Sequence, residues 1–125
     1  MSGGRKKATG AAGEAAAAAY LRSAGYAVVA NNWRCRYGEV DLVASTKDGA
    51  LVFVEVRARS AGTLDRFGAP LESITPRKQT TLRRCAQSYL QRLPSAPAAV
   101  RFDCIGVVLG ADGEPVSIHH IDNAF

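Results

Sequence analysis

The chain has 125 residues, of which 47% are hydrophobic and 22% charged, a composition typical of one globular domain. No run of 18 apolar residues predicts a membrane-spanning helix, and the alanine-rich start lacks the strongly apolar core of a signal peptide. The net charge of +5 favours polyanionic binding partners. The excess lies in the middle of the chain, where residues 34–92 hold eleven basic and six acidic residues. Three scattered cysteines exclude a disulfide framework or zinc spacing, so we expect free thiols in a reducing cytoplasm.

Residues 1–9 are predicted to be a flexible basic tail, and residues 10–125 to form one domain. A helix is expected from Ala11 to Ala24, because alanine favours helix and Gly25 suits a C-terminal stop. Glu14 lies on the apolar stripe of this helix, and two interpretations stay open. It points toward the core side, or it stabilises a first helical turn through the helix dipole.

The remaining elements give the order αβββαββ, which predicts an α/β domain with a central sheet flanked by helices. The second helix has Thr75 as a good N-cap and Pro76 in its first turn. The apolar run from Leu51 to Val56 indicates a strand buried on both faces. The strands are expected at residues 26–33, 39–45, 50–58, 101–109 and 116–121, with a loop at 62–70 and the second helix at 76–93.

Two acidic residues, Asp41 and Glu55, lie within strands that should be largely buried. A buried carboxylate is costly unless it is paired, hydrogen-bonded or bound to a metal. If Asp48-Gly49 formed a two-residue hairpin loop, the two acids would project to opposite faces of the sheet.

A three-residue loop, Lys47-Asp48-Gly49, gives a different arrangement when its glycine is in the left-handed conformation. Asp41 then faces Glu55, Glu39 faces Arg57, and all four side chains share one face of the sheet. We predict this register, because it gathers the costly charges where they can share a cation.

Carboxylate oxygens on rigid strands are a normal site for Mg²⁺ or Mn²⁺, and we expect one or two such ions. A metal of this kind activates water and stabilises charge on a phosphate, and Arg57 is placed to orient either one. The alternative is an ion-pair cluster on the sheet face, with Glu39 and Arg57 beside Asp41.

The pattern D-(X)n-E-X-K is the core of the PD-(D/E)XK nucleases, and Asp41, Glu55 and Arg57 follow it apart from the last residue. From about residue 10 onward the chain resembles the YraN family, bacterial proteins related to archaeal Holliday-junction resolvases and restriction endonucleases. The motifs that carry the resemblance are Gly13-Glu14, Asn32 with Arg34, Gly38-Glu39-Val40-Asp41-Leu42, Phe53-Val54-Glu55-Val56-Arg57, Phe67-Gly68, Lys78, Arg101-Phe102-Asp103 and Ile121-Asp122-Asn123-Ala124-Phe125.

This resemblance implies a restriction-endonuclease-like three-layer fold with a mixed sheet. It implies that Asp41 and Glu55 are metal ligands and that Glu14 is the helix-borne acid of the resolvase-like branch. It also allows a homodimer, because resolvases act as dimers. Arg57 occupies the place of the catalytic lysine, and arginine, which stays protonated, orients and stabilises but is a poor proton shuttle.

The lead hypothesis is a metal-dependent endonuclease-like protein that acts on nucleic acid, above all branched or recombining DNA. One alternative is a nuclease fold retained as a binding or scaffold module without cleavage, and another is a structural domain with an ion-pair network. Asp103, inside an apolar strand, is expected to be structural rather than a fourth acid of the site. The expected nucleic-acid contacts, which otherwise are solvated surface, are Arg34, Arg36, Arg59, Arg77, Lys78 and Arg84.

Overall fold

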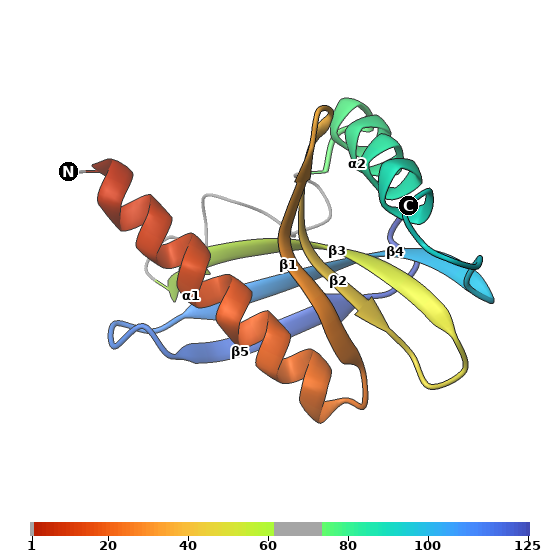
Figure 1. The fold of residues 1–125 in the computed structure, drawn as a ribbon. Helices are drawn as coiled ribbons and strands as arrows, with labels where there is room; N and C mark the ends of the chain where they lie inside the picture. The colour runs from red at the N-terminus through yellow and green to blue at the C-terminus, as the bar shows by residue number, and fades with distance from the viewer. Residues whose placement is uncertain (1, 62–73) are drawn as a thin grey trace.

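The computed structural model describes residues 2–61 and 74–125, and it shows a five-stranded mixed sheet between two helices (Figure 1). The strands lie in the order β1-β2-β3-β4-β5, and only β3 and β4 run parallel. The three-layer α/β fold expected from the sequence is thus confirmed. The elements are α1 (Ser2–Ser23), β1 (Ala27–Cys35), β2 (Gly38–Ser45), β3 (Ala50–Ser60), α2 (Pro76–Leu90), β4 (Ala99–Leu109) and β5 (Pro115–Ile121).

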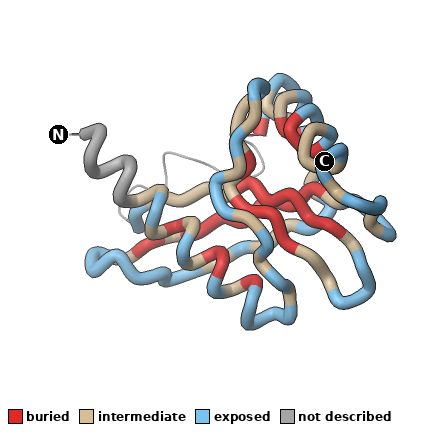
Figure 2. The backbone as a smooth tube through the Cα atoms, in the orientation of Figure 1, coloured by how far each residue is buried: buried red, intermediate tan, exposed pale blue. Residues whose placement is uncertain are grey.

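The central strand β3 is buried on both faces, as its apolar run predicts. Val52 and Val54 belong to a core cluster under α1, whereas Leu51 and Phe53 belong to a second cluster under α2. Figure 2 shows the buried backbone concentrated along the middle of the sheet. Because successive side chains of a strand point to opposite faces, the two helices cover opposite faces of the sheet.

Helix α1 begins at Ser2, earlier than the expected start at Ala11. The added segment combines residues that favour helix, Arg5, Lys6, Lys7 and Ala8, with three glycines that disfavour it, so residue propensity did not predict the extension. Gly13 sits where α1 approaches β3 most closely, since a Cβ built there would lie 2.3 Å from the Cβ of Ala58. The glycine therefore sets the distance at which the next residue, Glu14, meets the sheet.

Helix α2 starts as predicted. The side chain of Thr75 accepts a hydrogen bond from the backbone N–H of Lys78 at 3.1 Å, and Pro76 occupies the first turn. Leu82 and Cys85 pack the helix on the sheet, and Cys85 Sγ lies 3.4 Å from the thiol of Cys35. All three cysteines are free, as expected.

The turn between β2 and β3 has the predicted three-residue form. Ser45 pairs with Leu51 and Leu42 with Val54, which is the register that a loop at Lys47-Asp48-Gly49 requires. Gly49 has a φ of +90°, the left-handed conformation that such a loop needs. The register prediction is confirmed over the paired part of the two strands.

Asp103 is fully buried and structural, as expected. It accepts two hydrogen bonds from Arg101, at 2.9 and 2.7 Å, and one from the backbone N–H of Asn123 at 3.2 Å. Its Oδ2 also lies 2.7 Å from Nε2 of His120, whose Nδ1 is 2.9 Å from the hydroxyl of Tyr20. This network ties β4, β5 and α1 together and leaves Asp103 well satisfied.

The loop at 62–70 and its Phe67-Gly68 motif lie outside the described residues. Within the described part of the chain, neither helix has the length and apolar character needed to cross a membrane.

Candidate metal-dependent active site

The site begins where β2 and β3 stop pairing. The backbone pairing of the two strands ends at Leu42 and Val54, and beyond it the Oδ2 atom of Asp41 accepts a hydrogen bond from the backbone N–H of Val56 at 2.8 Å. The carboxylate of Asp41 thus takes the place that a backbone carbonyl of a neighbouring strand would fill. This bond fixes the side chain on a rigid part of the sheet.

Glu14 of α1 approaches the same point. One carboxylate oxygen each from Glu14, Glu39 and Asp41 lies within 4.8 Å of the others. The expectation that Glu14 points toward the sheet is therefore supported. Because α1 begins at Ser2, Glu14 is well inside the helix, so the alternative of a first-turn residue does not hold.

Asn32, a residue of β1, donates a side-chain hydrogen bond to Glu14 of α1. Asn31 pairs with Leu42 and Trp33 with Val40, so Asn32 stands opposite Asp41. The strand, expected at residues 26–33, continues to Cys35, with Asn32 at a φ of +49°. Burial and the charge of Asp41 raise the pKa of Glu14, and a hydrogen bond from Asn32 opposes them.

Glu55 is the most buried acid of the site, with only 4% of its surface exposed. Two cations approach its Oε2 atom: Nη2 of Arg57 at 3.0 Å and Nζ of Lys78 at 3.7 Å. Its other oxygen, Oε1, is buried and accepts no hydrogen bond from an N–H or O–H donor of the described residues. A side-chain hydrogen bond joins Glu55 to Asp41 when one of the two acids is protonated. An oxygen left without a donor is costly, and a ligand that bound it would remove the cost.

Asp41 and Glu55 are two buried acids close enough to raise the cost of ionising both. Burial, followed by the nearby charge of Asp41, raises the pKa of Glu55 to about 7. Burial also raises the pKa of Asp41, although the hydrogen bond from Val56 opposes the shift. The two carboxyl groups therefore resist being ionised together near neutral pH unless a cation joins them.

The expected one-face arrangement of four charged residues needs correction. Glu39 pairs with Arg34, whose Nε lies 2.8 Å from Oε2, and it lies with Glu14 under α1. Glu55 instead contacts Lys78 of α2, on the opposite face of the sheet.

The reason for this difference is a local break in β2. Val40 and Val43 both belong to the cluster under α2, although strict alternation would place residues three apart on opposite faces. The alternation therefore shifts between them, next to Asp41, which lies at the junction between the two acidic groups. The β2–β3 register is as predicted, but the faces are not.

The residues present fit a divalent cation that prefers oxygen. Asp41 belongs to the cluster with Glu14 and Glu39 and also interacts closely with Glu55, which makes it common to any ligand set built here. All these groups are carboxylates, the ligands that Mg²⁺ and Mn²⁺ prefer over nitrogen or sulfur. A buried pair of acids, in which Oε1 of Glu55 has no N–H or O–H donor among the described residues, distinguishes this group from an ordinary surface ion pair.

The residues expected to contact nucleic acid fall into three groups. Lys78 reaches the acidic site itself, a contact that the sequence analysis missed because it depends on how α2 packs over the sheet. Arg34 is held by Glu39 in an exposed ion pair, and Arg59 follows Arg57 on β3. Exposed side chains of α2 and of the β1–β2 turn account for the rest, namely Arg36, Arg77 and Arg84.

Comparison with known proteins places the chain in a single family. Residues 13–107 match the model of the uncharacterised protein family UPF0102. A UPF0102 protein of Ralstonia pickettii is 50% identical over 100 residues, which cover 80% of each chain. UPF0102 proteins of Desulforamulus reducens and Symbiobacterium thermophilum are 42% and 47% identical, covering 96% and 93% of this chain and 97% and 94% of their own.

Proposed function

We propose that this chain, which belongs to the uncharacterised protein family UPF0102, is a Mg²⁺- or Mn²⁺-dependent nuclease. The proposal rests on the acidic site. The substrate class is nucleic acid, above all DNA with a branched or recombining structure. The chemistry is hydrolysis of a phosphodiester bond at Asp41 and Glu55.

One observation carries this proposal. Glu55 is almost fully buried, its Oε1 accepts no hydrogen bond from an N–H or O–H donor of the described residues, and it shares a side-chain hydrogen bond with a second acid of raised pKa, Asp41. A purely structural ion-pair network would satisfy both oxygens of a buried carboxylate, as Asp103 is satisfied elsewhere in this fold. The contrast between two buried acids of one sheet favours a ligand site at Glu55.

Asp41 and Glu55 would hold the cation, with Glu14 beside Asp41. When bound, such a cation lowers the pKa of a water molecule and offsets charge on a phosphate. The protein's own contribution is to keep both acids on rigid strands, since Val56 fixes Asp41 by a backbone hydrogen bond. Glu14, which accepts a hydrogen bond from Asn32, would supply a further carboxylate oxygen beside Asp41.

Two cations flank the acids and suit a phosphate group. The guanidinium of Arg57 stays protonated, so it binds and stabilises phosphate oxygens without moving a proton. Lys78 brings a second positive charge to the same carboxylate from α2. Both side chains are more than a third exposed, which leaves them accessible to a nucleic-acid backbone.

A nucleic-acid-binding module without cleavage is the second candidate, and one observation favours it. Arg57 stands where the PD-(D/E)XK pattern has lysine, and it already pairs with Glu55 at 3.0 Å. If the missing lysine is essential for proton transfer, the protein would bind metal and nucleic acid without cutting.

A cleavage assay separates the two candidates. Labelled linear, single-stranded and four-way-junction DNA would be incubated with the protein and either Mg²⁺ or Mn²⁺, beside the variant Asp41→Asn. Cutting that requires the metal and is lost in the variant supports the nuclease. Salt-sensitive binding without cutting supports the module. Absence of both binding and cutting contradicts both.

A further inference from the structure

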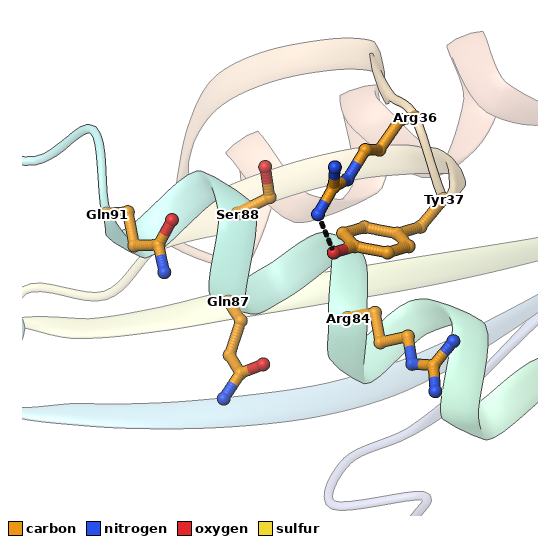
Figure 3. Close-up of a pocket in the computed structure, with 6 residues that line it drawn as sticks. All are labelled: Arg36, Tyr37, Arg84, Gln87, Ser88 and Gln91. Carbon is orange, nitrogen blue, oxygen red and sulfur yellow. Dashed lines mark hydrogen bonds between the residues drawn. The ribbon is translucent and has the colours of Figure 1, made fainter.

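We propose that a pocket between the β1–β2 turn and helix α2 binds a backbone phosphate of the nucleic acid, at a distance from the acidic site. The inference rests on the proposed function, because it takes the same polyanion as its ligand. The pocket has a volume of about 300 Å³ and is lined by Arg36, Tyr37, Arg84, Gln87, Ser88 and Gln91 (Figure 3).

The lining is rich in hydrogen-bond donors and has no carboxylate. It offers two guanidinium groups, two side-chain amides, a phenol and a hydroxyl, with a net charge of +2 from its two arginines. Small-molecule sites of this size are lined mainly by apolar side chains, whereas this one is almost entirely polar. Its chemistry therefore favours a phosphate group over a hydrophobic ligand.

Tyr37 holds the two cations of the pocket near one another. Nη2 of Arg36 donates a hydrogen bond to the Tyr37 hydroxyl at 2.6 Å, and its guanidinium carbon lies 4.8 Å from the centre of the ring. The guanidinium of Arg84 lies 5.8 Å from the same ring. Figure 3 shows Tyr37 between Arg36 of the turn and Arg84 of the helix. Contacts of this kind restrict the arginines before any anion binds.

An exposed stripe of α2 runs from the pocket to the first turn of the helix. No acidic residue occurs in this helix, and its first turn carries Lys78, which contacts Glu55. The stripe consists of Arg77, Thr80, Arg84, Gln87 and Gln91, all exposed.

Helix geometry gives the length of this path. With a rise of about 1.5 Å per residue, Arg84 lies about 9 Å and Gln87 about 14 Å beyond Lys78 along the axis. A duplex strand rises about 3.4 Å per nucleotide, so for a strand that runs along the helix the pocket would take a phosphate about three to four nucleotides beyond the one at Lys78. The continuity of the stripe favours a strand over an isolated anion as the occupant.

Binding of labelled DNA to the metal-free protein tests the pocket apart from catalysis. The test variant is Arg36→Gln/Arg84→Gln, and the matched control is Arg22→Gln/Lys47→Gln, which removes the same charge from exposed positions outside the pocket. The DNA must be long enough to reach both the acids and the pocket. We expect the test variant to bind roughly tenfold more weakly, and its salt dependence, as log Kd against log salt, to be less steep by about 0.9, the slope for one duplex phosphate.

Thermal melts of both variants show whether they fold, and single substitutions Arg36→Gln and Arg84→Gln replace the double variant if it does not. Equal binding by the test and control variants would overturn the pocket. The pocket would also be overturned if the wild-type protein does not bind DNA. The same holds if inorganic phosphate binds the protein but the substitutions leave its affinity for DNA unchanged. If wild type binds DNA through the pocket but never cuts it, the nuclease proposal fails while the pocket stands.

Discussion

The carboxylate of Asp41 accepts a hydrogen bond from the backbone N–H of Val56 at 2.8 Å, at the point where two strands of the sheet stop pairing. The same side chain lies within 4.8 Å of Glu14 and Glu39 and raises the pKa of Glu55. Asp41 thus has two roles: its oxygen accepts a structural hydrogen bond, and its carboxylate is a candidate metal ligand. Substitutions can separate these two roles.

Asp41→Asn and Asp41→Ala should differ in stability but not in metal binding. The amide oxygen of asparagine still accepts the hydrogen bond from Val56, whereas alanine leaves that N–H without its partner, at a cost of about 1–2 kcal/mol. Both variants lack the carboxylate, so neither should bind Mn²⁺ as wild type does. Urea unfolding and calorimetric titration with Mn²⁺ measure the two effects. Equal Mn²⁺ affinity in wild type and Asp41→Asn would rule out Asp41 as a ligand.

Stability of the metal-free protein should fall as pH rises from about 4.5 to about 7. The folded protein holds a proton on Glu55 up to about pH 7, whereas the unfolded chain loses it near its ordinary pKa of 4.5. The folded state therefore binds more protons in this window, and raising the pH favours the unfolded chain.

In Glu55→Gln this dependence should be flatter, and the variant should be more stable than wild type at about pH 8, by roughly 1–3 kcal/mol. Denaturant unfolding at several pH values gives the comparison. A parallel pH dependence in both proteins would show that Glu55 is not the group responsible. Mg²⁺ or Mn²⁺ should restore stability to wild type at about pH 8 and not to the variant.

The two cations at Glu55 should respond differently to substitution. Lys78→Met removes a charge that lowers the pKa of Glu55, so that pKa should rise further in the metal-free variant. NMR titration of the Glu55 carboxyl carbon measures it. An unchanged pKa in Lys78→Met would mean that the ammonium does not act on Glu55.

Arg57→Lys introduces the lysine of the nuclease pattern and should speed cleavage by roughly tenfold or more if proton transfer limits the rate. Single-turnover cleavage tests this expectation.

Gly13→Ala should destabilise the protein, although alanine is the better helix former. The added Cβ would lie 2.3 Å from the Cβ of Ala58, and overpacking of this kind costs about 1–3 kcal/mol. Gly10→Ala is the control in the same helix, since nothing lies within 4 Å of its Cβ, and it should be neutral or stabilising. Thermal unfolding compares them. Ala58→Gly should restore stability to Gly13→Ala, and failure to do so would place the strain elsewhere.

The order of elements and the β2–β3 turn could be predicted because they depend on local sequence. Gly49 suits the left-handed position of the loop, and Thr75-Pro76 starts a helix whatever lies around it. The register then followed by counting residues, and it placed Asp41 opposite Glu55.

The division of the site between two faces could not be predicted in this way. It depends on the shift of alternation between Val40 and Val43, where β2 leaves β3, and nothing in the residue types marks that shift. The contact of Lys78 with Glu55 likewise requires the packed position of α2. The hydrogen bond between Asn32 and Glu14 was not predicted either. Its one sequence signal was the asparagine itself, a residue that tolerates the left-handed conformation found at this position of β1.

The central claim is that Asp41 and Glu55 form a metal-dependent nuclease site, and cleavage of a labelled four-way DNA junction with Mn²⁺ or Mg²⁺ tests it most directly. The account predicts cutting by wild type that stops when the metal is chelated and is lost in Asp41→Asn, which retains the bond to Val56. Cutting that persists in Asp41→Asn, or folded wild-type protein that cuts no DNA substrate with either metal, would contradict it.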